Sequence, residues 1–168
     1  GNYSITGNAV TATPSAAVNI TGNLGIYGSP SVYGGGANTS SVGGNLLITN
    51  NSVFTIGSAA AAKTINVTGN VQVDAGSSVD VGPFNATHQL TISGNLITDG
   101  NFNMYTAPAQ FCNITFAGAT DNTVTGAGAV CNFNRITVNK GSSSANIIDV
   151  QRVITMTPPT AANNYLTI

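Results

Sequence analysis

Few side chains in this sequence carry groups suited to acid–base or nucleophilic chemistry. The chain has five Asp, no Glu and one histidine, His88. Cleavage of a glycosidic bond needs two carboxyl groups held a few ångströms apart, and no pair of charged residues recurs on one expected face. No Gly-x-Ser-x-Gly segment stands between a strand and a helix, as a serine hydrolase of the α/β type requires. We therefore expect no enzyme, no catalytic residue and no cofactor.

Two carboxylates, Asp74 and Asp99, are 25 residues apart and are weak candidates for a metal site. If the chain repeats with that period, they stack on one edge, where carboxylate oxygens are suitable ligands for calcium. The corresponding residue one repeat earlier is Thr49, however, and calcium-binding repeats carry Asp in dense Gly-Gly-x-Gly-x-Asp arrays, which this sequence lacks. We therefore expect no metal and interpret both residues as solvated turn carboxylates.

His88 directly precedes an alternating run that begins at Gln89, so we expect it to lie in a turn. One histidine makes no metal cluster, and a Cys–His nucleophile needs a third group to orient it. Cys112 and Cys131 lie near the ends of consecutive repeats. In an oxidising compartment they are candidates for a disulfide, worth about 3 kcal/mol for a loop of this size. The alternative is a pair of buried free thiols.

Three tyrosines are candidates for contact with sugars. Tyr27 and Tyr33 flank a Gly-rich segment that we expect to be a flexible loop, and Tyr105 falls at an outward position. Aromatic rings offer a broad apolar face on which a sugar ring can stack. Scattered surface tyrosines are also ordinary in folded proteins, so contact with a surface polysaccharide is a secondary hypothesis.

An internal repeat indicates which elements position these residues. A Gly-Asn pair recurs before an apolar residue at steps of 22, 25 and 25 residues, at Gly22-Asn23-Leu24, Gly44-Asn45-Leu46, Gly69-Asn70-Val71 and Gly94-Asn95-Leu96. A period of that length is typical of a solenoid. Each repeat holds three short runs of alternating polarity between turn-rich stretches, which is the unit of a parallel β-helix. The prediction is an all-β fold, a right-handed parallel β-helix, with an antiparallel β-sandwich or jelly roll as the alternative.

Alternation within the runs assigns the faces, because successive strand residues point to opposite sides. In the next repeat we expect Leu96 to keep its place and Met104 to lie over Val79. The last run of that repeat, residues 114–116, arrives one residue early, and a shortened fourth repeat ends at residues 135–138. Twelve residues are expected to point inward and stack between repeats: Leu46, Ile48, Phe54, Ile56, Ile65, Val67, Val71, Val73, Val79, Val81, Leu90 and Ile92.

Composition narrows the class of protein further. Only 5% of the residues are charged and the net charge is −1, so the chain lacks the basic patch that nucleic-acid binding needs. No apolar run approaches the roughly 18 residues that span a bilayer as a helix, so we expect no insertion into a membrane. A surface rich in Asn, Thr, Ser and Gly with so few charges suits an extracellular or assembled protein better than a monomeric cytosolic one.

We expect one continuous solenoid with two parts. Residues 1–43 form an irregular, Gly-rich β segment with the first rungs, and residues 44–168 form the regular rungs. The final run, residues 165–168, matches residues 89–92, after which another repeat begins. Natural solenoids cap their ends with a polar repeat, and no cap is recognisable in the sequence. We therefore expect a fragment of a longer chain, or a subunit that contacts neighbouring repeats or copies of itself end to end.

One stretch resembles a known group of proteins. Residues 122–141, Asn-Thr-Val-Thr-Gly-Ala-Gly-Ala-Val-Cys-Asn-Phe-Asn-Arg-Ile-Thr-Val-Asn-Lys-Gly, resemble a motif repeated in very large secreted surface proteins of Bacteroidota, and residues 111–118 resemble a shortened copy. The resemblance implies a cell-surface adhesin or filament exported by the type IX secretion system, with gliding-motility adhesins as one branch, and it carries over no catalytic residue. The two cysteines and the Gly-rich segment 25–44 depart from the pattern.

The leading prediction is a non-catalytic structural or adhesive segment of an extracellular cell-surface adhesin or filament. Two alternatives stay open. One is a β-helix module that binds polysaccharide, with Tyr27, Tyr33 and Tyr105 as candidate contacts. The other is a pilus-like fibre subunit with a sandwich fold, which assembles by strand donation.

Overall fold

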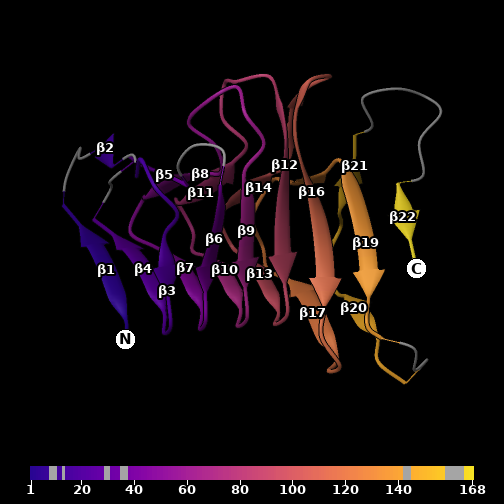
Figure 1. Ribbon diagram of the computed structural model, residues 1–168. Coiled ribbons are helices and arrows are strands. Elements are labelled where there is room, and N and C mark those ends of the chain that lie inside the picture. Colours follow the sequence, from indigo (N-terminus) through magenta and orange to yellow (C-terminus); the bar gives the residue numbers. More distant parts are fainter. Residues whose placement is uncertain (8–10, 13, 29–30, 35–37, 142–144, 158–164) are drawn as a thin grey trace.

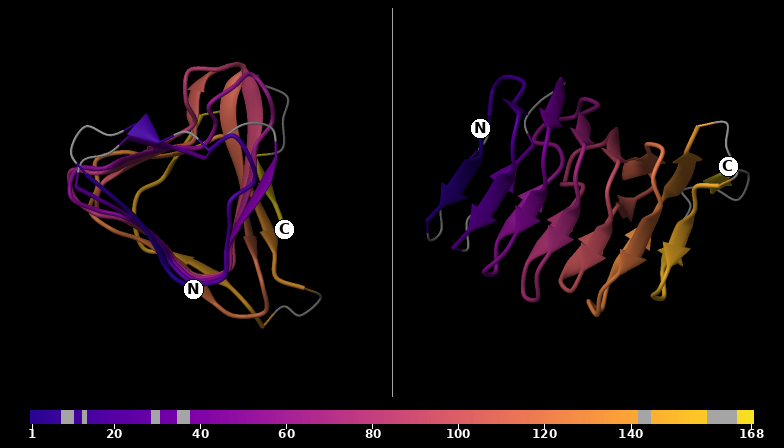
Figure 2. Two further views of the ribbon diagram at one scale, coloured as in Figure 1. Left: turned by 60° about the vertical axis from the view of Figure 1, so that its left-hand side comes forward. Right: turned by 90° about the horizontal axis from the view of Figure 1, so that it is seen from below.

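The chain folds as a right-handed parallel β-helix in which three sheets are filled in turn (Figure 1). The computed structural model describes residues 1–7, 11–12, 14–28, 31–34, 38–141, 145–157 and 165–168. Each rung contributes one strand to each of sheets A, B and C. Seen nearly along the axis, the rungs superimpose on a triangle (Figure 2), and the two termini lie at opposite ends of the stack.

Each sheet is a parallel ladder that gains one strand per rung. Sheet A contains β1 (Tyr3–Thr6), β4 (Leu24–Tyr27), β7 (Leu46–Ile48), β10 (Val71–Val73), β13 (Leu96–Thr98), β17 (Asn122–Thr125) and β20 (Ile148–Val150). Sheet B contains β2 (Thr11–Ala12), β5 (Ser31–Tyr33), β8 (Val53–Thr55), β11 (Ser78–Asp80), β14 (Asn101–Asn103), β18 (Cys131–Phe133) and β21 (Thr155–Met156). Sheet C contains β3 (Asn19–Ile20), β6 (Thr39–Val42), β9 (Thr64–Val67), β12 (Ala86–Ile92), β16 (Gln110–Ala117), β19 (Arg135–Asn139) and β22 (Leu166–Thr167), and β15 (Tyr105–Ala107) pairs with β16.

Apolar side chains from all three sheets fill the interior in vertical stacks. All twelve residues that the alternation predicts to face inward are buried, and none is more than 3% exposed. Leu46 pairs with Val71 in sheet A, and Ile65 pairs with Leu90 in sheet C, as the 25-residue period predicts. The shortened runs are also confirmed, because Leu90 pairs with Ile114 and Ile114 pairs with Ile136.

One predicted register is wrong. Phe102, not Met104, pairs with Val79 in sheet B. The turn between sheets A and B has four residues, 74–77, in the earlier rung but only two, 99–100, in the later one. The strand of the later rung therefore begins two residues sooner than a constant period predicts. Met104 is still fully buried, beyond the end of β14.

The described part of residues 1–43 contains the first two rungs. The described part of this segment forms β1 to β6, which join the same three ladders as the later rungs. Tyr3 pairs with Leu24, and Leu24 pairs with Leu46, so the first steps are 21 and 22 residues. The Gly-rich stretch beside Tyr27 and Tyr33, which was predicted to be a loop, lies partly outside the described residues, and its described part includes β5.

The pairing pattern excludes the alternative folds. The three ladders are parallel throughout, and the antiparallel pairing found among the described residues joins β15 to β16. A sandwich or jelly roll is antiparallel, so both alternatives are wrong. The pilus-like subunit was predicted with a sandwich fold, which the chain does not have. No helix in the described part of the chain has the length and apolar character needed to cross a membrane.

Candidate functional site

The corner where sheet C leads into sheet A carries a ladder of asparagine side chains. The Oδ1 atom of each Asn accepts the backbone N–H of the Asn one rung later, and Asn95 accepts the N–H of Thr123 at 2.9 Å. We call this the asparagine corner. The N–O distances along it are 2.9, 2.7, 2.8 and 2.7 Å for the successive pairs Asn2–Asn23, Asn23–Asn45, Asn45–Asn70 and Asn70–Asn95.

The glycine before each asparagine is required by the close approach of two rungs. A Cβ atom at Gly69 would lie 2.4 Å from Asn45 Oδ1 and 2.7 Å from the carbonyl oxygen of Gly44. Backbone atoms cannot move away as a side chain can, so no larger residue fits without a shift of the rung. The ladder ends where Asn122 takes the place of the glycine, and its Nδ2 donates to the carbonyl of Ser93 at 2.9 Å.

The corner where sheet B leads into sheet C differs from rung to rung. The connection from β8 to β9 differs in length from those that follow β11 and β14, and β12 and β16 are the longest strands of sheet C. Their extended ends and the β15–β16 pairing make this corner protrude from the triangle (Figure 2, left). We call it the lobed corner.

Polar side chains form a buried column inside the lobed corner. Lys63, His88 and Cys112 are each 0% exposed. His88 pairs with Cys112, and Lys63 directly precedes Thr64, which pairs with Gln89. The prediction that His88 lies in a turn is wrong, because β12 begins at Ala86. His88 lies two residues before the inward Leu90, so the same alternation turns its ring into the core. We call these three residues the polar column.

The amine of Lys63 reaches back to the preceding rung. Lys63 Nζ donates to Ser40 Oγ at 2.6 Å and is in direct contact with Asn38 Oδ1. The Ser40 oxygen also accepts the backbone N–H of Val18 at 2.9 Å. Burial lowers the pKa of Lys63, and no described carboxylate forms an ion pair with it. The site therefore favours the neutral amine more strongly than water does.

The imidazole of His88 is held with one nitrogen unsatisfied. Its Nδ1 accepts the backbone N–H of Lys63 at 3.1 Å, and its Nε2 is buried without a partner among the described residues. Gly57 lies against the ring, since a Cβ there would be 2.3 Å from Cε1. Burial lowers the pKa of His88, so the ring is neutral at neutral pH.

The two cysteines lie on different sheets. Cys112 is in β16 of sheet C and Cys131 is in β18 of sheet B, and both are buried free thiols in the structure. Burial raises the pKa of both thiols. Of the two arrangements that the sequence left open, the structure therefore contains the free thiols. A buried thiol with a raised pKa is a weak nucleophile and packs as an apolar group.

Asp74 and Asp99 lie outside the solenoid, at the turn between sheets A and B. Asp74 accepts a hydrogen bond from Gln72 Nε2 at 2.8 Å, and Asp99 accepts one from the N–H of Ala127 at 2.9 Å. They line a shallow surface hollow with Asn50 and Asn51. The described residues contain no group of three or more His, Cys, Asp or Glu side chains placed to hold a metal. Asp74 thus accepts a hydrogen bond from a side chain of its own rung, and Asp99 accepts one from the backbone of the next rung.

The structure does not bring the three candidate tyrosines together. Tyr27 is in sheet A, and its ring lies over Gly25, where a Cβ would be 2.2 Å from the ring. Tyr33 is in sheet B, and its side chain lies outside the described residues. Tyr105 is in β15 at the lobed corner. The three therefore belong to different sheets and make no shared platform for a sugar.

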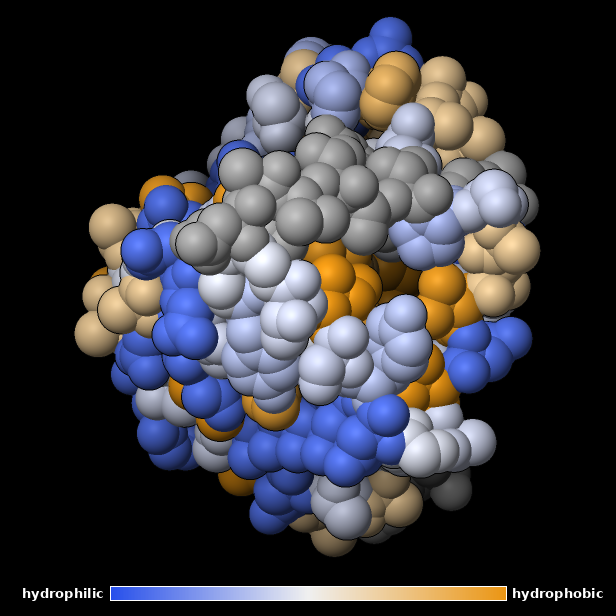
Figure 3. Space-filling view, turned by 90° about the vertical axis from the view of Figure 1, so that its left-hand side faces the viewer, coloured by the Kyte–Doolittle hydropathy of each residue, from blue (hydrophilic) through white to orange (hydrophobic). Residues whose placement is uncertain are grey.

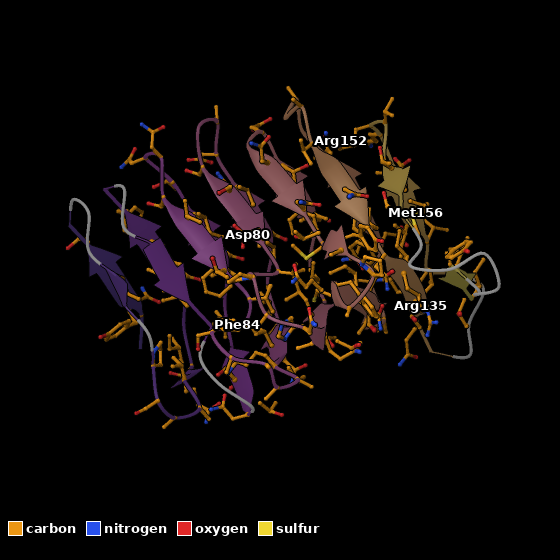
Figure 4. All side chains as sticks on the ribbon, turned by 90° about the horizontal axis from the view of Figure 1, so that it is seen from above. Asp80, Phe84, Arg135, Arg152 and Met156 are labelled. Carbon is orange, nitrogen blue, oxygen red and sulfur yellow. The ribbon has the colours of Figure 1, made fainter. Side chains whose placement is uncertain are left out.

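A groove with a carboxylate follows the outer face of sheet B beside the lobed corner. It has a volume of about 470 Å³, and its lining includes Asp80, Thr55, Asn103 and Thr106. Burial raises the pKa of Asp80, while hydrogen bonds from Thr55 and the N–H of Gly82 oppose that shift. Asp80 and the half-exposed Phe84 of the following loop are labelled in Figure 4. The groove therefore places polar groups beside the apolar side chains of Val53 and Pro83.

Sequence reasoning did not single out Lys63, Asn38 or Ser40. The alternation of inward and outward residues supplied a signal for Lys63. It lies two residues before the inward Ile65, as His88 lies two residues before Leu90. The contact with Asn38 needs the register between two rungs, which no single run of residues contains.

No family model matches the chain, and no curated protein and no solved structure matches it.

Proposed function

We propose that this chain is a structural and adhesive segment of an extracellular cell-surface adhesin or filament, and that it is not an enzyme. The observation that supports the proposal best is the direction of its hydrogen bonds. Bonds between parallel strands run from rung to rung, and so do the bonds of the asparagine corner. In a solenoid, a pull along the axis is then shared by three strand ladders and, from Asn2 to Thr123, by the side-chain ladder as well.

The placement of the reactive side chains favours the same proposal. Lys63, His88 and Cys112 have the chemical groups of an acid–base or nucleophilic site, but all three are sealed in the interior. Catalysis requires that a substrate reach the reacting group. The side chains that face outward on sheet C are mainly Thr, Ser, Asn and Gln, which suit hydrogen bonding to neighbours or to water.

The partner that we propose for each end is another set of rungs, from neighbouring repeats or from a copy of the chain. Among the described residues, β1, β2 and β3 pair on one side only. The N-terminal end encloses a hollow of about 750 Å³ lined by Leu24, Val32, Leu46 and Phe54 among others. Figure 3 shows apolar side chains in this hollow. A rung of the same fold would pair with these strands and cover this surface.

The location outside the cell is proposed from composition and from the resemblance to secreted Bacteroidota adhesins. Antibody labelling of intact producing cells tests it. We expect signal on the surface of unbroken cells, at the level of a known surface protein. Signal that appears only after lysis would contradict an extracellular role.

Force spectroscopy on the chain held by its two termini tests the mechanical role. We expect the double variant Asn45→Ala/Asn70→Ala to unfold at a clearly lower force than the wild type, because it loses two consecutive side-chain bonds of the ladder. The variant Asn66→Ala, which alters an outward residue of sheet C, is the matched control and should unfold like the wild type. Equal forces for the double variant and the wild type would contradict the proposal.

A second candidate function is polysaccharide binding in the groove beside Asp80, which replaces the tyrosine platform as its proposed site. A glycan array discriminates the two functions. We expect a carbohydrate-binding module to lose its signal on Asp80→Asn and to keep it on Asp74→Asn, whose carboxylate lies at another corner. A wild-type chain that binds no glycan on the array would favour the purely structural role.

A further inference from the structure

The Lys63 amine and the Asn38 carboxamide form a partly buried contact between two rungs. Asn38 directly precedes β6 in the second rung, and Lys63 directly precedes β9 in the third. The lysine is 0% exposed, and its Nζ contacts Asn38 Oδ1 and lies 2.6 Å from Ser40 Oγ. An amine and a primary carboxamide held in direct contact are the two reactants of an amide exchange.

A second buried lysine shows how unusual this surrounding is. Lys140 Nζ donates to the backbone carbonyls of Ala117 and Thr120 at 3.0 and 2.9 Å. Burial lowers the pKa of Lys140 too, and the carboxylate of Asp121 opposes that shift. Lys63 has neither arrangement among the described residues, because both of its Nζ partners are side-chain oxygens and desolvation alone shifts its pKa. Lys140 thus has a carboxylate nearby that favours its ammonium form, whereas the amine of Lys63 contacts a carboxamide and a hydroxyl instead.

We propose that Lys63 and Asn38 join in an intramolecular isopeptide bond. The lone pair of the neutral Nζ attacks Cγ of Asn38, and a C–N bond forms while the carbonyl π electrons move to Oδ1. Collapse of that tetrahedral intermediate breaks the bond from Cγ to Nδ2. The products are a secondary amide between the two side chains and one molecule of ammonia, so no oxidant, reductant or other reactant is needed.

Ser40 is the group placed to move the proton. The nitrogen that attacks must lose a proton, and the Nδ2 that leaves must gain one. Ser40 Oγ lies 2.6 Å from Nζ, and the N–H of Val18 fixes its position at 2.9 Å. The hydroxyl accepts the proton from Nζ and passes its own proton toward the leaving nitrogen, which is the role of a general acid–base relay.

The bond would tie the second rung to the third across the lobed corner. It closes a loop between residues 38 and 63, so unfolding could not separate those rungs fully. Loop closure limits the entropy of the unfolded chain. Formation of the bond does not depend on a role of the chain at a cell surface.

Intact mass spectrometry of the denatured wild-type chain tests the bond. We expect a mass below that of the sequence by about 17 Da, the mass of one ammonia. Trypsin locates the loss, because it cleaves after a free lysine but not after one in an amide. The linked chain should give a single fragment from residue 1 to residue 135 that lacks ammonia, whereas an unlinked chain gives separate fragments 1–63 and 64–135.

Two variants supply the controls. Asn38→Ala and Lys63→Arg should both have the full mass of their sequences, and trypsin should cleave each of them after residue 63. Ser40→Ala should form the bond about 100-fold more slowly, which is the size of effect expected for loss of a proton relay. Equal rates for that variant and the wild type would overturn the role of Ser40.

The wild type alone decides the main question, even if a variant fails to fold. A wild-type chain at its full mass, with a tryptic fragment that ends at Lys63, overturns the proposal. A loss of ammonia with normal cleavage after Lys63 also overturns it, because the reaction that released the ammonia then did not involve Lys63.

Discussion

The asparagine corner and the lobed corner solve the same geometric problem in different ways. At both corners the chain must turn from one sheet of the triangle to the next. The strand that follows must then pair with a strand of the previous rung. The asparagine corner does so with the same Gly-Asn pair in successive rungs, and every step adds a similar hydrogen bond. The lobed corner uses connections of different length, and it buries Lys63, His88 and Cys112 in its polar column.

The difference shows why one corner leaves a repeated motif in the sequence and the other does not. A pair of residues recurs where every rung needs the same close approach, as at Gly69, whose Cβ would strike the preceding rung. Where the connections vary, each buried polar group has its own partners and leaves no repeated motif. The regular corner therefore supports a continuous stack, while the irregular corner is where individual chemistry can occur.

The largest effect is expected from a change that removes the core shared by both corners. Leu90→Asp places an unpaired charge at a position that is 1% exposed. A buried, unpaired charge is among the few changes that cost more than about 4 kcal/mol. Circular dichroism during urea unfolding should show the loss. Thr91→Asp, one residue further along on the outer face, is the control and should stay within about 0.5 kcal/mol of the wild type. Equal stability of the two variants would show that the faces are assigned wrongly.

The next effect is expected at the glycine of the asparagine corner. Gly69→Ala brings a Cβ within 3 Å of backbone atoms of Gly44, and overpacking of this kind costs about 1–3 kcal/mol. Thermal unfolding measures the change. At Gly1, by comparison, an added Cβ meets nothing within 4 Å, so Gly1→Ala should leave the melting temperature unchanged. A neutral Gly69→Ala would mean that the rungs do not approach as closely as described.

A smaller loss is expected when one step of the ladder is removed. Asn70→Ala leaves the N–H of Asn95 without the acceptor that it has at 2.7 Å. An unsatisfied donor of this kind costs about 1–3 kcal/mol, less where water can reach it. Urea unfolding of this variant beside Asn66→Ala, which removes an outward amide, isolates the contribution of the ladder. The ladder contributes nothing if the two variants unfold at the same urea concentration.

The smallest effect concerns the lobed corner and depends on pH. Burial lowers the pKa of His88 from its usual 6.5 in the folded state. The unfolded chain therefore binds the proton first, and stability falls as the pH drops below 6.5 toward the lower folded pKa. Because the chain has one histidine, His88→Gln should remove this slope between pH 7 and pH 5. Denaturant unfolding at several pH values provides the measurement, and an identical slope in the variant would contradict the burial of a neutral ring.

The repeat and the alternation were enough to predict the fold and its core. Gly-Asn pairs and period-2 runs lead to the parallel ladders and to all twelve inward residues, because strand pairing and burial both follow from local spacing. That spacing does not reveal a change of turn length between rungs. It therefore did not predict that Phe102, rather than Met104, lies over Val79. The contact between Lys63 and Asn38 was missed for a related reason, since it joins residues that are neighbours only after the register is known.

Amide hydrogen exchange at the asparagine corner tests most directly whether the rungs are joined along the axis. In the folded chain, the N–H groups of Asn45, Asn70 and Asn95 are bonded to the rung before them. They should exchange as slowly as the strand amides of sheet A, and Asn70→Ala should speed exchange at Asn95 while Asn45 stays slow. Corner amides that exchange as fast as those of an exposed loop in the wild type would contradict the account.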